Sequence, residues 1–295
     1  MEVSPAQLPK DTSEIVDFVV ARIPEQDRTI LRSDLDGESA RSLRAYVSYQ
    51  RRDMLAGVSL VRTASNLPDG AAYVMVCTRA DLGGRGLGSA LFAAVLSDLG
   101  EHVTRLVTCV LEDDHRSMSV ARHWGFQEMQ SSVTTSVDLF GARVPDPIAG
   151  VTFEECADLV FDDEEAVGTM LLASQTNPEF DLGLVLELSS LRETPAPGQR
   201  PIAVLTRVGG RPAALSFAVA DGDQMHVVYT GVDPGSRGRR LALFTKQALH
   251  AHARELGIRT ALTENEESNT GIRRVNDQLG YARHSSWSWM MRPRP

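Results

Sequence analysis

Two segments rich in glycine and arginine, each following an apolar run, have the residue types of a phosphate-binding loop. The first contains Arg85, Gly86 and Gly88, and the second contains Arg237 and Gly238. A helix that begins beside such residues offers unpaired backbone N–H groups and the positive end of its dipole, so a pyrophosphate can approach closely. Neither segment has the lysine of a Walker loop, which argues against P-loop binding of ATP.

A dinucleotide-binding fold is the alternative that these glycines leave open. Gly84-x-Gly86 is a fragment of the GxGxxG pattern, and the next predicted strand ends near Glu112, where a ribose ligand would lie. However, the third glycine position holds Ser89, and the loop follows hairpin strands instead of opening a βαβ unit. The pattern therefore favours a phosphate loop of another class.

The two loops belong to an internal repeat. Residues 77–92 and 229–244 align at an offset of 152, with eight identical residues, and Gly125 aligns with Gly280 at an offset of 155. A duplication of this kind predicts two domains, at residues 1–140 and 151–295. Residues 141–150 contain two prolines and two glycines and are predicted to link them, and residues 193–201 are predicted to form a loop.

Apolar periodicity predicts the same order of elements in each half. The predicted fold class is α/β (α+β), in which each domain has a mixed, mostly antiparallel sheet flanked by helices. The predicted helices are residues 13–21, 86–99, 115–124, 241–256 and 270–279. The predicted strands are residues 43–49, 54–61, 71–77, 105–111, 131–139, 202–208, 213–220, 226–232, 260–263 and 286–291.

The composition restricts the partners of the chain. A net charge of −9 argues against a nucleic-acid binder but is compatible with a cationic amine. The three cysteines form no CxxC or Cys/His cluster, so we expect packing roles, with no disulfide framework and no metal site. No apolar run approaches the ~18 residues of a membrane span, and the first ten residues lack the apolar core of a signal peptide. These features predict a cytoplasmic protein without a membrane partner.

Both loops resemble the (Gln/Arg)-x-x-Gly-x-(Gly/Ala) signature of the GNAT N-acyltransferase superfamily. The first copy is Arg85-Gly-Leu-Gly-Ser-Ala90. The second is Arg237-Gly-Arg-Arg-Leu-Ala242, which follows Val-Asp-Pro and has an arginine at the glycine position. The stretch from Asn269 to Tyr281 is similar to the Asn-x6-(Tyr/Asn)-x3-Gly-Phe helix of that superfamily. The tandem arrangement is similar to that of mycothiol synthases and other double-GNAT proteins.

The resemblance implies direct transfer of an acyl group from acyl-CoA, most simply acetyl-CoA, to an amine, without a metal. Pantetheine would lie in a split between the strand before the loop and the next strand, with a backbone N–H near Val232 facing the thioester oxygen. Arg239, Arg240 and Lys246 could reach the CoA phosphates. The residues expected to hold CoA are Val232, Arg237, Gly238, Arg239, Arg240, Leu241, Ala242 and Asn269 in the second half, and Arg85, Gly86, Gly88, Ser89 and Ala90 in the first.

The strand before the loop indicates which half is catalytic. In sequences similar to mycothiol synthase, an acidic base lies eight residues before the proline of Val-Asp-Pro, and here that position is His226. Histidine titrates near neutrality and is suited to general-base work. The same count in the first half leads to Val74, which cannot titrate. We therefore expect chemistry in the C-terminal half, although CoA bound in the N-terminal half stays open.

Three further residues are candidates for proton transfer in that half. Glu264 closes the strand after the phosphate helix, where the two strands should diverge. Asn276 takes the place of the tyrosine acid of many relatives, and an amide can donate a hydrogen bond to a thiolate but cannot readily give up a proton. Tyr229 could supply that proton if it points into the cleft, and otherwise belongs to the core. Trp287 and Trp289 could line an acceptor pocket or pack in the core.

The sequence therefore predicts an N-acetyltransferase that acts on a primary amine of a small molecule. An acyltransferase with another acyl or aminoacyl donor is the alternative within the enzymes. A regulatory protein that binds CoA without catalysis is the alternative outside them, because of Arg240 and Asn276. We expect a monomer with an internal pseudo-dimer, or a weak homodimer.

Overall fold

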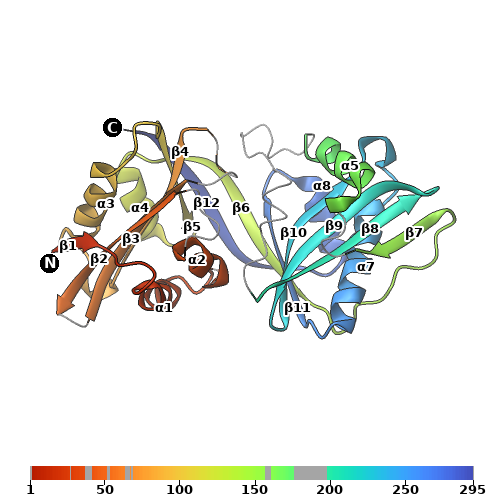
Figure 1. The fold of residues 1–295 in the computed structure, drawn as a ribbon, viewed down its shortest axis with the longest axis horizontal. Coiled ribbons are helices and arrows are strands. Elements are labelled where there is room, and N and C mark those ends of the chain that lie inside the picture. Colours follow the sequence, from red (N-terminus) through yellow and green to blue (C-terminus); the bar gives the residue numbers. More distant parts are fainter. Residues whose placement is uncertain are drawn as a thin grey trace. The chain divides into compact units, whose positions relative to one another are not determined.

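The structure, a computed structural model, describes residues 2–294 apart from 27, 37–41, 52–53, 64–66, 68, 157–160 and 176–197. The chain divides into two compact units (Figure 1). Unit 1 consists of Met1–Met129 and Ser288–Pro295, and unit 2 consists of Gln130–Trp287. Unit 1 therefore takes its last strand segment from the C-terminal end of the chain. Unit 2 begins before the middle of the chain, at Gln130.

Unit 1 is built on strands in the order β1-β2-β3-β4-β5, followed by the last residues of β12. Among the described residues, β1 with β2, β2 with β3 and β3 with β4 pair antiparallel, whereas β4 pairs with β5 in parallel. The elements are β1 (Val3–Pro5), α1 (Thr12–Arg22), α2 (Arg28–Leu35), β2 (Ser42–Arg51), β3 (Met54–Thr63), β4 (Ala71–Thr78), α3 (Leu87–Ser97), β5 (Arg105–Leu111) and α4 (His115–His123).

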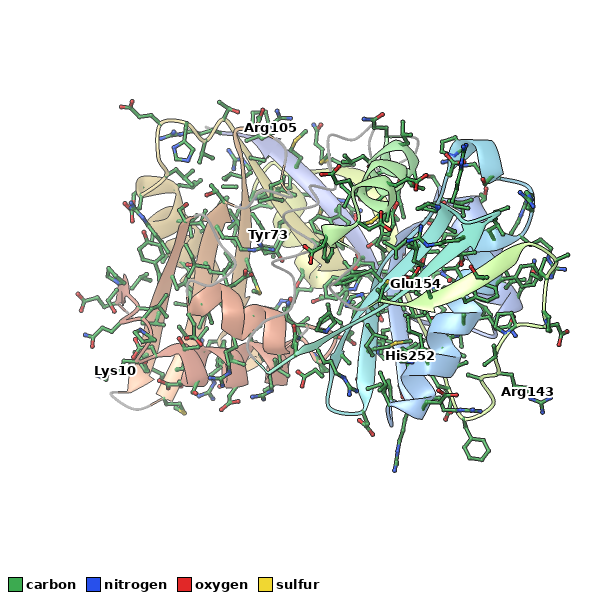
Figure 2. All side chains as sticks on the ribbon, turned by 45° about the vertical axis from the view of Figure 1, so that its right-hand side comes forward. Lys10, Tyr73, Arg105, Arg143, Glu154 and His252 are labelled. Atoms are coloured by element: carbon green, nitrogen blue, oxygen red, sulfur yellow. The ribbon has the colours of Figure 1, made fainter. Side chains whose placement is uncertain are left out.

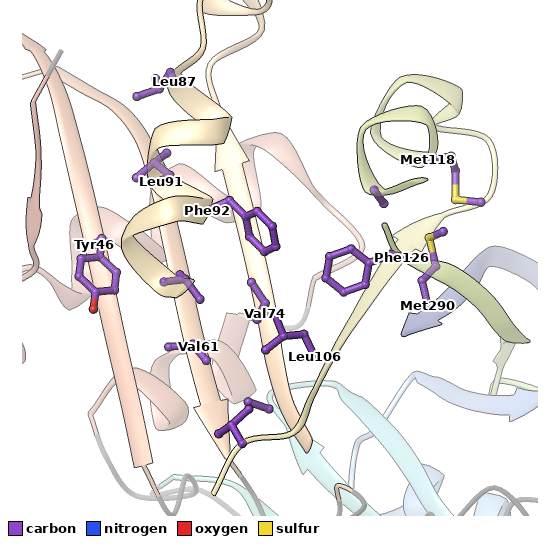
Figure 3. Close-up of a cluster of buried hydrophobic side chains, with 14 of the residues drawn as sticks. Tyr46, Val61, Val74, Leu87, Leu91, Phe92, Leu106, Met118, Phe126 and Met290 are labelled. Atoms are coloured by element: carbon purple, nitrogen blue, oxygen red, sulfur yellow. The ribbon is translucent and has the colours of Figure 1, made fainter. Parts of the chain in front are cut away.

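The strands of unit 1 are apolar on both faces because helices cover both faces. Along β4, Ala72 and Val74 pack into a cluster with α3 and α4, whereas Tyr73, Met75 and Cys77 pack into a second cluster with α1 and α2. Figure 3 shows the first of these clusters around α3. This strict alternation means that β4 runs through the sheet without a break in its phase.

Unit 2 repeats this topology with strands in the order β6-β11-β10-β9-β8-β7. A parallel pairing joins β10 to β11, the counterparts of β4 and β5. The elements are β6 (Gln127–Asp138), β7 (Val151–Glu155), α5 (Glu164–Ser174), β8 (Arg200–Val208), β9 (Arg211–Asp221), β10 (Gln224–Val232), α7 (Leu241–Glu255), β11 (Thr260–Glu266), α8 (Thr270–Gln278) and β12 (Ala282–Pro293).

Two cores flank the sheet of unit 2. One lies under α7 and contains Met225 and Val227 of β10, and the other lies under α5 and contains Tyr229 of the same strand. The register of β10 against β9 shifts between Val227 and Tyr229, which leaves Val228 as an extra residue in a β-bulge. A one-residue insertion moves the following side chains to the opposite face, which is why Tyr229 leaves the core of Val227.

The predicted fold class is confirmed, and the predicted helices and strands are present with ends within about four residues of those expected. The short strands β1 and β7 and the helices α2 and α5 were not predicted. The loop expected at residues 193–201 lies largely outside the described residues. The linker at residues 141–150 stays a prediction. Among the described helices, none has the length and apolarity to cross a membrane.

Candidate functional site

The main feature of the candidate site is a fork between β10 and β11 in unit 2. The two strands pair in parallel over three residues, of which the last pair is His226 with Leu262. Thr263 Oγ1 donates to the Val227 carbonyl over 3.1 Å, and no further strand pairing joins β10 to β11 beyond that point within the described residues. The backbone of Val228 to Val232 therefore keeps hydrogen-bonding groups that do not pair with β11, as expected for the predicted split.

His226 and Glu264 face the same side of the sheet at this fork, the side that α5 covers. Met225 and Val227 pack under α7, so alternation points His226, which lies between them, to the opposite face. On β11, Ala261 also packs under α7, so Glu264 points with His226. Glu264 is exposed and accepts a hydrogen bond from Ser132 Oγ of β6.

The structural counterpart of His226 in unit 1 is Tyr73, and not Val74 as predicted. Tyr73 forms the last parallel pair of β4 with β5, as His226 does in unit 2. The prediction was wrong by one residue because two differences partly cancel. The turns before the phosphate helices, Ala80–Leu82 and Pro234–Ser236, are displaced by two residues from the predicted alignment, whereas the bulge gives β10 one residue, Val228, that β4 lacks. Tyr73 is fully buried, and burial raises the pKa of its hydroxyl well above the ordinary value.

Unit 1 shows how close two side chains at these positions can come. The counterpart of Glu264 is Cys109, because Thr260 of β11 and Arg105 of β5 occupy the same place in the parallel pairing. Tyr73 Oη and Cys109 Sγ are 3.3 Å apart. The equivalent positions of the two strands can therefore place reacting groups in direct contact across the fork.

The two phosphate loops are also offset by two residues from the predicted alignment. In unit 1 the left-handed backbone residues are Gly84 (φ 75°) and Gly86 (φ 80°), and in unit 2 they are Gly238 (φ 78°) and Arg240 (φ 61°). Gly86 and Arg240 are both the N-caps of the helices that follow. The structure therefore pairs Gly86 with Arg240 and Arg85 with Arg239, and the pairing of Arg85 with Arg237 is wrong.

The helices after the loops, α3 and α7, have open N-termini. Neither has a side-chain hydrogen bond at its N-cap or an acidic residue in its first turn. In contrast, Asp114, Asp163 and Asn269 cap α4, α5 and α8 with their side chains. The first N–H groups of α3 and α7 are therefore left for an anionic ligand.

The arginines of the second loop are exposed, but their side chains do not all point to the loop. Arg237 Nε donates to the Val232 carbonyl over 3.4 Å. Arg240 Nη2 lies 3.5 Å from Gln278 Oε1, and its guanidinium lies 5.4 Å from the centroid of the Phe244 ring. Arg240 therefore turns toward α8, and it neither folds over the loop nor blocks it.

Lys246 does not reach the solvent-exposed region in which a phosphate ligand would bind. It is fully buried, and burial lowers its pKa to about 7. Its Nζ donates to Asn276 Oδ1 over 2.6 Å, and Asn276 Nδ2 donates to Asn265 Oδ1 over 2.7 Å. The expectation that Lys246 reaches the CoA phosphates is wrong, and Asn276 is the centre of a polar network that the sequence did not reveal.

Two aromatic residues next to this network complete it. Lys246 Nζ lies 4.5 Å from the centroid of the Tyr281 ring, and the Tyr281 hydroxyl pairs with His250 Nε2 at 2.8 Å. Burial, together with the charge of Lys246, lowers the pKa of His250 to about 3, so this imidazole is neutral.

The other aromatic candidates lie in cores. Tyr229 is buried under α5, where its hydroxyl donates to the Met170 carbonyl over 3.1 Å, and burial raises its pKa. The Tyr229 ring lies over Gly231, where an added Cβ would come within 2.0 Å of the hydroxyl oxygen. Trp289 packs in unit 1 with its ring centroid 6.3 Å from that of Tyr73, whereas Trp287 belongs to unit 2.

One group of possible metal ligands lies on β7 and α7 of unit 2. Glu155, His252 and Glu255 offer ligand atoms that all lie within 4.8 Å of one another, and Figure 2 labels His252. His252 Nδ1 is 3.0 Å from Glu155 Oε2, so an ion pair accounts for this arrangement without a metal. The prediction that the protein uses no metal stays a prediction.

Solved structures share the whole architecture. A tandem GNAT protein from the clavulanic acid biosynthesis pathway matches with a TM-score of 0.78 at 18% identity, covering 100% of this chain and 98% of its own. A GCN5-related N-acetyltransferase from Sphaerobacter thermophilus matches with a TM-score of 0.73 at 14% identity, covering 99% of this chain and 96% of its own. A glucosamine N-acetyltransferase region of a fungal multi-domain GH3 β-N-acetylglucosaminidase matches with a TM-score of 0.69 at 12% identity, covering 99% of this chain and 38% of its own.

The sequence gives a match over one part of the chain. The model of the acetyltransferase (GNAT) domain family matches residues 188–261, and no curated protein sequence matches the chain. At such low identities the structural likenesses establish the fold. The chain therefore has a tandem GNAT fold, and residues 188–261 of its second half are similar to the acetyltransferase (GNAT) domain family.

Proposed function

We propose that unit 2 transfers an acetyl group from acetyl-CoA directly to a primary amine of a small molecule. The observation that carries this proposal is the fork between β10 and β11, with His226 and Glu264 on one face of it. The open N-terminus of α7 lies at the end of the same strand, so one ligand can contact both.

The pyrophosphate of the donor would bind the first N–H groups of α7, at Leu241 and Ala242, beside the left-handed Gly238. Arg239 is exposed and adds a charge that can pair with phosphate. Asn269 keeps a structural role as the N-cap of α8. The pantetheine would then extend along Val228 to Val232, whose backbone groups do not pair with β11.

His226 is proposed as the general base. It accepts a proton from the ammonium form of the substrate, and Glu264 attracts the cationic amine or stabilises the charged imidazole. His226 passes this proton to solvent, and the free amine attacks the thioester carbon while a backbone N–H near Val232 stabilises the oxyanion. His226 then takes the second proton from the amine nitrogen as the C–S bond breaks, which leaves a neutral amide. The electron pair stays on sulfur, and the CoA thiolate leaves beside α8, on which Asn276 lies.

Tyr229 is proposed to be structural, because its buried hydroxyl is already donated to Met170. Unit 1 lacks the equivalents of the proposed chemistry. It has Tyr73 and Cys109 in place of His226 and Glu264, and β4 has no bulge. An open α3 N-terminus nevertheless leaves unit 1 able to bind a CoA pyrophosphate.

The proposal is tested by calorimetric titration of acetyl-CoA into the whole chain and into two matched variants, Gly84→Trp and Gly238→Trp. Both glycines have a left-handed backbone and open space at the Cβ position, so the strain of the substitution is equal. Loss of binding in Gly238→Trp is the expected result. Loss only in Gly84→Trp would move the donor to unit 1 and refute the assignment.

Turnover is measured separately on a panel of primary amines, by release of the CoA thiol. His226→Ala should lower kcat/KM by about 100-fold or more while acetyl-CoA still binds. Binding of acetyl-CoA without turnover of any amine would favour a regulatory CoA-binding protein. Turnover with propionyl-CoA or a longer donor but not with acetyl-CoA would identify a different acyltransferase.

A further inference from the structure

The buried network of unit 2 has a fixed direction. Lys246 Nζ donates to Asn276 Oδ1, so Asn276 turns its carbonyl oxygen toward Lys246 and its amide nitrogen away. Asn276 then donates to Asn265 Oδ1, which in turn leaves Asn265 Nδ2 as the terminal donor. The hydrogen bonds among the described residues leave this nitrogen without an acceptor. Aligned amides polarise one another, so the hydrogen bond from Lys246 strengthens the donor at the end of the chain.

The end of this relay lies at the fork. Asn265 follows Thr263, whose hydroxyl reaches across to Val227 at the last contact between the strands. Asn265 is only partly buried, while Lys246 and Asn276 are buried behind it. A ligand in the fork can therefore meet Asn265 Nδ2 but not the lysine.

Unit 1 shows that the fold does not need this network. The positions equivalent to the five polar members are all apolar and lie in one hydrophobic cluster, of which Figure 3 labels Phe92 and Phe126. Phe92 replaces Lys246 and stacks on Trp124 with centroids 4.5 Å apart. The remaining replacements, for Asn265, Asn276, Tyr281 and His250, are Val110, Ala121, Phe126 and Leu96.

The identity of the buried cation also matters. The chain contains only two lysines, and its other 28 basic residues are arginines. Lys10 is exposed, whereas Lys246 occupies the interior of unit 2 (Figure 2 labels Lys10). A guanidinium would not fit a single amide oxygen in this way, because its five donors need several acceptors, whereas an ammonium is a compact charge.

We infer that Lys246, Asn276 and Asn265 form a directed relay that presents a polarised N–H to the departing thiolate of CoA. The inference rests on the proposed acyl transfer in unit 2. Asn265 is the catalytic residue because it would touch the sulfur, and Lys246 and Asn276 are positioning residues. No proton moves along the relay: the two protons that the ammonium nitrogen loses leave one after the other through His226 to solvent, the C–S bond breaks, and the sulfur keeps its electron pair as a hydrogen-bonded thiolate.

The relay is tested through the thiol of bound CoA, whose thiolate absorbs in the ultraviolet. The complexes of CoA and desulfo-CoA are titrated with base, and the difference spectrum reports the pKa of the bound thiol. In the wild type we expect that pKa to be lower than in Lys246→Met by about 1, because the hydrogen bond from Lys246 holds the two amides with an N–H toward the sulfur, and a donor to the charged form favours the thiolate. Asn265→Leu, at a partly exposed strand position, should raise it equally, and kcat should fall about tenfold in both, with KM nearly unchanged.

His250→Leu is the matched control, because it introduces the residue that unit 1 carries at that position and leaves the relay intact. This control should keep the wild-type pKa of the bound thiol. Equal thiol pKa values in the wild type and both relay variants would refute the relay. A change in Lys246→Met but not in Asn265→Leu would also refute it, because the donor would not be Asn265. Failure of desulfo-CoA to bind the wild type would instead contradict the proposed function.

Discussion

The buried lysine Lys246 should make the free energy of unfolding rise with pH, whereas the buried cysteine thiols should make it fall. Lys246 is fully buried, and burial lowers its pKa to about 7. In the unfolded chain a lysine titrates near pH ~10.4, so between these values the unfolded state binds a proton that the folded state does not. The free energy of unfolding therefore rises with pH in this window and loses this gain as pH falls toward 7.

The magnitude follows from the two pKa values. When only the unfolded state is protonated, the slope approaches about 1.4 kcal/mol per pH unit. Between about pH 7.5 and pH 9, the wild type should gain about 2 kcal/mol relative to Lys246→Met, which lacks the titrating group. Methionine has a similar length, so the variant should fill the same space.

The measurement is urea unfolding of both proteins at the two pH values, followed by circular dichroism. Burial raises the pKa of Cys77 to about 11 and of Cys156 to about 12, which lowers stability as pH rises toward 9. That effect is common to both proteins and cancels in the difference. His250 stays neutral throughout because its pKa is about 3. Parallel changes in the two proteins would refute the reasoning.

A direct observation of Lys246 is also available. The chain has two lysines, so protein labelled with ¹³C-lysine should give two side-chain signals, with Lys10 as the exposed reference. The Lys246 signal should titrate near pH 7. A Lys246 signal that does not titrate below pH ~9 would contradict both the pKa and the stability argument.

Three substitutions near the fork should test the local geometry. Tyr229→Phe should lower the free energy of unfolding by about 1 kcal/mol, because the Met170 carbonyl loses its donor, with kcat unchanged; a large loss of kcat would make Tyr229 the acid. Gly231→Ala should lower the free energy of unfolding by about 1–3 kcal/mol, because the added Cβ would overlap the Tyr229 side chain. If the effects of Gly231→Ala and Tyr229→Leu on this free energy were additive in the double variant, no such overlap would exist. Arg240→Gly should stabilise unit 2 by about 0.5–1 kcal/mol by removing left-handed strain, measured by urea unfolding; destabilisation would indicate that the contacts with Phe244 and Gln278 are worth more than the strain.

The order and bounds of most elements were predictable because they depend on local periodicity. The alignment of the two halves was not, because eight identities between residues 77–92 and 229–244 favoured a register that the backbone does not adopt. The left-handed residues Gly84 and Gly86 correspond to Gly238 and Arg240, and an arginine in that conformation has no local sequence signal. The bulge at Val228 changes the register again, and a single extra residue in an apolar strand is invisible to periodicity.

The role of Lys246 could not be predicted because its burial depends on partners distant in sequence. Asn276 and Tyr281 lie about 30 residues after Lys246 in the sequence. Their contacts with Lys246 exist only in the folded structure, so the sequence alone does not show why these polar residues are buried. By contrast, the sequence did draw attention to His226 and Glu264 as candidates, and the structure shows that both face one side of the sheet at the fork. Their roles in catalysis stay predictions.

The duplication offers an internal reference for what the fold requires. At the same positions, unit 1 packs Phe92, Val110 and Ala121, while unit 2 buries a lysine and two amides. Burying a lysine costs stability, because its pKa must fall by about 3 before it can be neutral in the folded state. Apolar substitutes clearly fit this backbone, so stability alone would favour them in unit 2 as well. Under the proposed relay, unit 2 keeps a cost that unit 1 avoids because the buried lysine and amides orient the donor at the fork, and the thiol titration measures that donor.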